Sequence, residues 1–192
     1  MIRRALSFAL VCWAALSWSA VATAREDHGA LTFVAHEAEV ADAHVIDVRD
    51  LQSCAQASLP GARCLPIRSL VSPTDGLVGF HALRWLLGTV GLSGAQTVLV
   101  IGANARDVRT VGALLYLAGQ RRVRLLDKPF APQSDDPGGV ARSLSREVVF
   151  TEPMRDKRLL INRQSGGAPY TDLASFAEAV ERGDKEARLL LP

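Results

Sequence analysis

The stretch TVLVIGANARDVRTVGALLYLAG, residues 97–119, predicts a strand, a loop and a helix in succession. Thr97–Ile101 is a short apolar run of the kind found in buried parallel strands. Helical spacing follows, with apolar positions at Val108, Val111, Leu115 and Ala118 before Gly119. A buried strand that leads through a short loop into an amphipathic helix is typical of α/β proteins.

The same alternation continues on both sides of this stretch. The predicted elements are a strand at His44–Val48, a two-turn helix at Asp50–Ala57, an extended piece at Arg63–Ile67, a helix at Phe80–Val90 and a strand at Val123–Leu126. Because short connections join strands and helices in turn, we predict an α/β fold with a mostly parallel sheet and helices on both of its faces.

Composition and charge narrow the class of protein. The 192 residues suffice for one domain with an appendage, and 48% hydrophobic against 22% charged residues excludes wholesale disorder. Lys and Arg number 22 and Asp and Glu 20. Removal of Arg3 and Arg4 with a leader segment would leave 20 of each. A neutral chain with 6% aromatic residues gives no indication of binding to nucleic acid or to an anionic membrane.

Residues 1–24 have the organisation of a secretory signal peptide. Met1–Arg4 is basic, Ala5–Val21 is almost entirely apolar or small, and Ala22-Thr23-Ala24 offers the small residues that a signal peptidase requires. A single membrane anchor is the alternative. We expect cleavage near Arg25, no stable membrane span afterwards, and a periplasmic or secreted protein.

The mature chain divides into a domain at residues 25–130 and a C-terminal extension at 131–192. Residues 131–139 have the composition of a linker. Strands are predicted at Glu147–Thr151 and Arg158–Ile161, and an amphipathic helix at Asp172–Glu181, with Leu173, Phe176, Ala177 and Val180 on its apolar face. So little apolar content indicates an extension that packs on the first domain.

A set of short motifs relates residues 31–130 to a known family. Asp47-Val48-Arg49 is followed by Leu59-Pro60-Gly61-Ala62 and Leu65-Pro66, and then by the strand, loop and helix of residues 97–119. In this order and spacing the chain resembles the rhodanese family. The resemblance implies the rhodanese α/β fold, in which the loop between the central strand and the next helix holds a cysteine that carries sulfur as a persulfide.

The corresponding loop of this chain has no cysteine. Its residues are Gly102, Ala103, Asn104, Ala105, Arg106 and Asp107, and the resemblance places Gly102 at the position of the nucleophile. A shift by one residue would place Ile101 or Ala103 there, and neither can accept sulfur. The loop amides, the following helix and Arg106 or Arg109 could still bind an anion. The alternative is a tight strand-to-helix connection without a ligand.

Asp47 and Arg49 end a strand that would lie beside this loop. Ligands of open α/β sheets bind at the carboxyl ends of strands, so both residues are candidates for the rim of a site. The alternative is structural, with Asp47 bound to nearby backbone amides and Arg49 paired with an acid.

Cys54 and Cys64 are the cysteines of the expected mature chain. The compartment and the turn between them favour a disulfide. Two free buried thiols, or a pair with redox or sulfur chemistry, are the alternatives.

The remaining motifs point to neither metal nor cofactor. His28, His36, His44 and His81 lack paired ligand spacing, and no phosphate-binding or dinucleotide-binding glycine pattern is present. The sequence therefore favours a non-catalytic module that binds a small oxyanion or a protein partner. The competing function is a sulfurtransferase or redox protein that uses Cys54 and Cys64.

Overall fold

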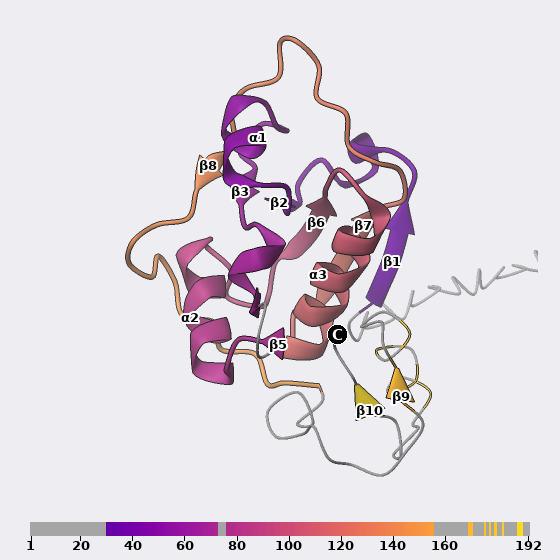
Figure 1. The fold of residues 1–192 in the computed structure, drawn as a ribbon, viewed down its shortest axis with the longest axis vertical. Helices are drawn as coiled ribbons and strands as arrows, with labels where there is room; N and C mark the ends of the chain where they lie inside the picture. Colours follow the sequence, from indigo (N-terminus) through magenta and orange to yellow (C-terminus); the bar gives the residue numbers. More distant parts are fainter. Residues whose placement is uncertain are drawn as a thin grey trace, which may run out of the picture.

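A computed structural model describes residues 30–72 and 76–155, together with residues 169–170, 175, 177, 179, 182 and 188–189 (Figure 1). The predicted signal peptide and the predicted strand Arg158–Ile161 lie outside the described residues. Within the described residues, no helix is both long and apolar enough to span a bilayer.

Six parallel strands form the main sheet, in the order β1-β7-β6-β2-β3-β8. Their bounds are β1 (Ala30–Val34), β2 (His44–Asp47), β3 (Arg63–Cys64), β6 (Thr97–Ile101), β7 (Arg122–Leu126) and β8 (Val140–Ala141). Two small pairs stand apart from it: β4 (Val71–Ser72) with β5 (Gly76–Leu77), and β9 (Pro169–Tyr170) with β10 (Arg188–Leu189). The predicted α/β class and parallel sheet are confirmed.

The helices that pack on the sheet are α1 (Leu51–Gln56), α2 (Phe80–Thr89) and α3 (Ala105–Ala118), with 3-10 turns η1 (Glu37–Val40) and η2 (Ile67–Ser69). α1 and α3 begin at polar caps that the sequence supplies, whereas α2 follows Gly79 and has no side-chain cap. Asp50 caps α1 and Asn104 caps α3, which therefore starts two residues before the predicted Asp107. Gly119 ends α3 with a φ of 118°, a conformation that favours glycine.

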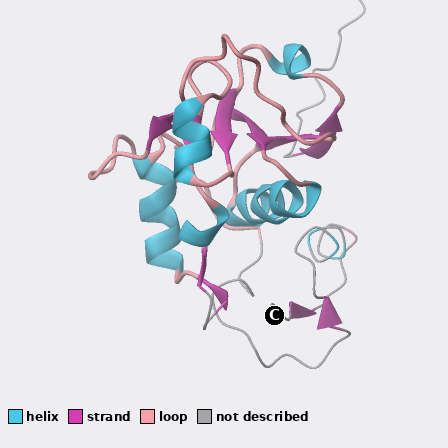
Figure 2. Ribbon diagram, turned by 45° about the horizontal axis from the view of Figure 1, so that its top comes forward, coloured by secondary structure: helices cyan, strands magenta, loops and turns pink. Residues whose placement is uncertain are grey.

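The two faces of the sheet are covered unequally (Figure 2). α2 and α3 bury the larger core, which includes Leu87, Val100 and Leu115. On the opposite face α1, η1 and the chain after β7 cover a smaller cluster that includes Leu99, Ile101 and Phe130. Helices thus lie on both faces, as predicted. The side switches because successive right-handed crossovers run toward opposite edges of the sheet.

Residues 131–155 belong to the same packed unit as the sheet. Gly139 N donates to Cys54 O (2.8 Å), and Val140 N donates to Ala62 O (2.8 Å), which adds β8 beside β3. Phe150 is fully buried in the larger core. The chain directly after the expected linker therefore forms an edge strand, and we call residues 140–150 the strap.

The structure differs from one prediction for the C-terminal part and describes only some residues of another. Glu147–Thr151 is not a strand, because its backbone bonds to the end of α2 and to the following turn: Glu147 N donates to Gly88 O (3.0 Å), and Thr151 N to Ser93 O (3.0 Å). Of the predicted helix at 172–181, residues 175, 177 and 179 are described and helical, and Ala177 and Ala179 join the larger core. The remainder of that helix lies outside the described residues.

Candidate functional site

A pocket opens where β2 and β6 end, at the edge where a ligand site was predicted. Its volume is about 330 Å³. It is lined by Val48, Arg49, Asp50, Ser53, Pro66, Ile67, Arg68, Ala103, Asn104 and Asp107. The structure thus brings one predicted rim residue, Arg49, together with three of the six predicted loop residues.

Gly102 is buried and is not among the lining residues. A Cβ placed on Gly102 would lie 2.7 Å from Val48 Cγ2 and 3.0 Å from Val108 Cγ2, closer than packed carbon atoms approach. The branched side chain of Val48 cannot swing aside freely. The position that the resemblance assigns to a nucleophile therefore lacks both a side chain and the room for one.

The start of α3 is satisfied by its own side chains. Asn104 Oδ1 accepts a hydrogen bond from Asp107 N (2.8 Å), and Asn104 Nδ2 donates to Asp107 Oδ2 (2.7 Å). The carboxylate of Asp107 thus lies at the positive end of the helix, where an anionic ligand would otherwise be attracted. Ala105, Arg106 and Arg109 do not line the pocket.

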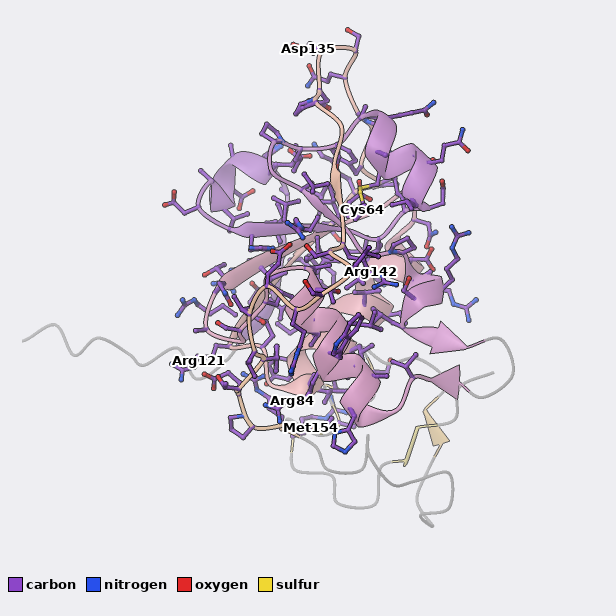
Figure 3. All side chains as sticks on the ribbon, turned by 90° about the vertical axis from the view of Figure 1, so that its left-hand side faces the viewer. Cys64, Arg84, Arg121, Asp135, Arg142 and Met154 are labelled. Atoms are coloured by element: carbon purple, nitrogen blue, oxygen red, sulfur yellow. A yellow bond between two sulfur atoms is a disulfide. The ribbon has the colours of Figure 1, made fainter. Side chains whose placement is uncertain are left out.

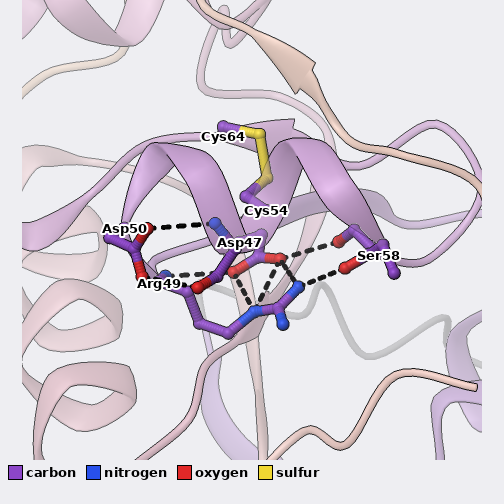
Figure 4. Close-up of a disulfide and its surroundings, with 8 residues drawn as sticks. Asp47, Arg49, Asp50, Cys54, Ser58 and Cys64 are labelled. Carbon is purple, nitrogen blue, oxygen red and sulfur yellow. Dashed lines mark hydrogen bonds and ion pairs between the residues drawn. A yellow bond between two sulfur atoms is a disulfide. The ribbon is translucent and has the colours of Figure 1, made fainter.

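Asp47 and Arg49 form an internal ion pair (Figure 4). Arg49 Nε donates to Asp47 Oδ1 (3.1 Å) and its Nη2 donates to Asp47 Oδ2 (2.7 Å) and to Ala57 O (2.5 Å). Ser58 Oγ donates to the fully buried Asp47 carboxylate (2.7 Å), and the Arg49 guanidinium lies 4.9 Å from the centre of the Phe130 ring. The guanidinium is therefore used within the fold, and the geometry corresponds to the structural interpretation of this pair.

Asp50, Ser53 and Arg68 line the pocket without having been predicted. Ser53 donates to Asp50 from its hydroxyl (2.6 Å) and from its backbone amide (3.0 Å). These hydrogen bonds, together with the positive charge of Arg68, lower the pKa of Asp50. The Asp47-Val48-Arg49 motif ends at Arg49, but Asp50 and Arg68 also follow the carboxyl ends of β2 and β3, and this position is the signal that could have indicated them.

The charged side chains that line the pocket balance in number. The two arginines, Arg49 and Arg68, oppose the two carboxylates, Asp50 and Asp107. The charge of Arg49 is already compensated by Asp47 behind it. What remains exposed to a ligand is one arginine against two carboxylates, which disfavours a small anion.

The predicted disulfide between Cys54 and Cys64 is confirmed, with Cα atoms 5.9 Å apart. Both residues are buried, and neither lines the pocket. Gly139 crosses the bond so closely that a Cβ there would lie 2.5 Å from Cys54 Sγ. The adjacent residue Ser53 faces the pocket, so the disulfide holds one wall of it.

The three described histidines lie apart from the pocket lining. His44 Nε2 bonds to Val90 O (2.7 Å), and burial lowers the pKa of this imidazole. His36 and His81 are exposed. Among the described residues, no group of three His, Cys, Asp or Glu side chains could hold a metal ion.

Comparisons with known proteins give matches among solved structures. No family model matches the chain, and no curated protein matches it in sequence. The rhodanese-like domain of the Alr3790 protein from Anabaena sp. is 24% identical over 46% of this chain and 76% of that one, with a TM-score of 0.35. YnjE is 22% identical over 67% of this chain, with a TM-score of 0.46.

A variant of EanB in complex with hercynine is 18% identical over 73% of this chain, with a TM-score of 0.49. The chain spans 35% of YnjE and 35% of this EanB variant. Rhodanese-like domain proteins are therefore among the structural neighbours of this chain.

Proposed function

We propose that the chain is an exported rhodanese-like domain that does not transfer sulfur and that serves as a protein-interaction module. The observation that carries this proposal is the closure around Gly102. Val48 and Val108 occupy the space that a side chain at position 102 would need, so this position can hold no nucleophile without moving its neighbours.

The two remaining thiols do not offer a substitute. Sulfur transfer requires a thiolate that attacks the sulfur donor and then carries a persulfide. The sulfur atoms of Cys54 and Cys64 are bonded to each other, and Gly139 covers them. A thiolate would form only after a reductant cleaved the bond, and it would lie outside the pocket.

A small oxyanion is the second candidate ligand of the pocket. Arg68 and the start of α3 favour it, because both present positive charge to the pocket. Asp50 and Asp107 oppose it. Calorimetric titration with sulfate and with thiosulfate would decide: binding that Arg68→Ala abolishes would establish an anion site.

The proposal is tested by a thiosulfate–cyanide assay on the exported protein. We expect no turnover above a buffer control, and the same result for Cys54→Ser and for Cys64→Ser. Turnover that either substitution abolished would support a relocated nucleophile and overturn the proposal. Export is tested separately by mass spectrometry, which should find an N-terminus near Arg25, whereas a retained Met1 would contradict it.

A further inference from the structure

The strap and α2 together form one face of the molecule, on which Figure 3 labels Arg84 and Arg142. The strap follows α2 in the reverse direction. Ser143 N donates to Thr89 O (2.9 Å), and Arg84 Nε donates to Phe150 O (2.9 Å). Because the strap's backbone is held against the helix at both ends, its outward side chains are presented to solvent on a fixed frame.

Exposed apolar side chains are concentrated on α2 and the strap. Six large hydrophobic residues are exposed in the described part of the chain, and four of them lie on α2 or the strap: Trp85 (39%), Val140 (51%), Leu144 (94%) and Val149 (56%). Single exposed apolar residues need no explanation, whereas several gathered on one face indicate a binding surface.

The charge presented beside these side chains is positive. Arg142 and Arg146 are exposed and flank Leu144 in the sequence, and the Arg142 guanidinium lies 5.9 Å from the centre of the Trp85 ring. Neither arginine forms an ion pair with any residue that the structure describes. The acidic residue of the strap, Glu147, is already bound to Arg63 (2.5 Å).

We infer that this face, defined by Trp85, Leu144, Val149, Arg142 and Arg146, docks an acidic segment of a partner protein that also carries apolar side chains. The inference rests on the proposed function as an interaction module. Tryptophan and arginine are the residue types that most often dominate protein interfaces, and unpaired positive charge selects an acidic partner.

Two other occupants fit the face less well. A two-fold contact with a second copy would bring the same positively charged patch of both copies together, so that like charges would lie near each other. An anionic membrane is bound by clusters of about four to eight basic residues, whereas the exposed arginines of this face are Arg142 and Arg146, and Arg84 is bound to Phe150 O. An acidic, apolar peptide satisfies both the charge and the apolar surface.

The test is site-specific photo-crosslinking in the cells that produce the protein, with a photoreactive residue at Leu144 of the full chain. Tryptic peptides joined to Leu144 are then sequenced. We expect partner peptides with a net negative charge, and a roughly fivefold lower yield in Arg146→Glu. The matched reversal Lys128→Glu, on the exposed segment after β7, should leave the yield unchanged.

Each other outcome overturns part of the account. Adducts on phospholipid, on a second copy of the chain or on basic peptides would refute the inferred surface. A parallel probe at the exposed Leu51, beside the pocket, separates the two proposals. Adducts from Leu51 alone would keep the interaction function and reject this surface. No adduct from either position would reject both, while the absence of sulfur transfer would still be judged by the thiosulfate assay.

Discussion

Two strand-to-helix connections meet at the pocket, and they are stabilised differently. Both helices begin at a polar cap: Asp50 accepts from Ser53 N (3.0 Å) and Asn104 accepts from Asp107 N (2.8 Å). α3 then continues for 14 residues and buries nine of them. α1 has six residues, of which only Cys54 is buried.

The difference shows how a short helix can be fixed without a large apolar face. α1 is held by the Cys54–Cys64 bond and, at its end, by Arg49 and Ser58 bound to Asp47. Burial of apolar side chains stabilises α3 instead. The wall of the pocket formed by α1 therefore depends on specific bonds, and the wall formed by α3 depends on the core.

The largest loss of stability is expected when one partner of the Arg49–Asp47 ion pair beside α1 is removed. Arg49→Ala would leave the buried Asp47 carboxylate without its cation, at a cost of about 3–5 kcal/mol in the free energy of unfolding. Urea denaturation measures this. Arg49→Lys is the control, since it retains the charge but loses the two-pronged geometry, and it should recover part of the loss. An Arg49→Ala variant as stable as the wild type would refute this account of α1.

The second prediction concerns the core under α3. Leu115 is fully buried, so Leu115→Ala should lower the free energy of unfolding by about 3 kcal/mol, through lost burial and the cavity that remains. The exposed Arg109→Ala on the same helix is the control and should have little effect. Equal effects of the two substitutions would show that α3 does not depend on the core.

The disulfide should contribute somewhat less to the free energy of unfolding than Arg49 or Leu115. Replacement of both Cys54 and Cys64 by Ala should cost about 2–3 kcal/mol, according to the chain-entropy description of a loop of this length. Thermal unfolding should show a midpoint lower by roughly 4–8 °C. Two free sulfhydryls in a thiol titration of the native protein would contradict the bond itself.

The smallest losses of stability are expected at the two helix caps, Asp50 and Asn104, and only the loss at Asp50 should depend on pH. Hydrogen bonds from Ser53 lower the pKa of Asp50 below its ordinary 3.8, so the unfolded state binds its proton first as the pH falls. The stabilisation by Asp50 is therefore complete above pH 3.8 and is lost as the pH falls through the lower folded-state pKa.

Asp50→Ala should accordingly destabilise the protein at neutral pH and have a smaller effect in acid. Asn104→Ala should cost about 1 kcal/mol through the lost cap, and the neutral amide that it removes does not titrate. Denaturant titrations at two pH values measure both. Asp50→Asn is the control that keeps a cap, and a pH-independent Asp50→Ala effect would contradict the assignment.

Much of the fold follows from local pattern. Thr97–Ile101 was predicted with its observed bounds, because a buried parallel strand reads as an uninterrupted apolar run. The position of α1 was predicted because Asp50 can begin a helix and the turn at Leu59-Pro60-Gly61 ends it. The disulfide was predicted from that turn together with the expected oxidising compartment.

The strap was missed because its structure depends on distant contacts. Gly138 and Gly139 have the composition of a linker, yet they are required because Ala55 and the disulfide pass so close to their backbone. β8 pairs with β3, 77 positions away in the chain, as Val140 opposite Arg63. Glycines demanded by close packing cannot be distinguished in sequence from glycines that favour a flexible loop.

The closure around Gly102 could also not be predicted. The sequence shows the absent cysteine, but the contact of that position with Val48 and Val108 arises only when β2 and α3 pack together. Ala103, one position further along, lines the pocket. The sequence therefore shows that position 102 lacks a cysteine, and only the structure shows that a side chain there would have no room.

The most direct test of the central claim is the intact mass of the purified protein after incubation with thiosulfate and removal of excess reagent. We expect an unchanged mass, because position 102 has no side chain that could accept sulfur. Gly102→Cys should also remain unmodified, since its side chain would face Val48 and Val108, whereas Ala103→Cys should place a thiol in the pocket and react with an alkylating agent. A gain of one sulfur atom by the unaltered protein would contradict the claim that the domain does not transfer sulfur.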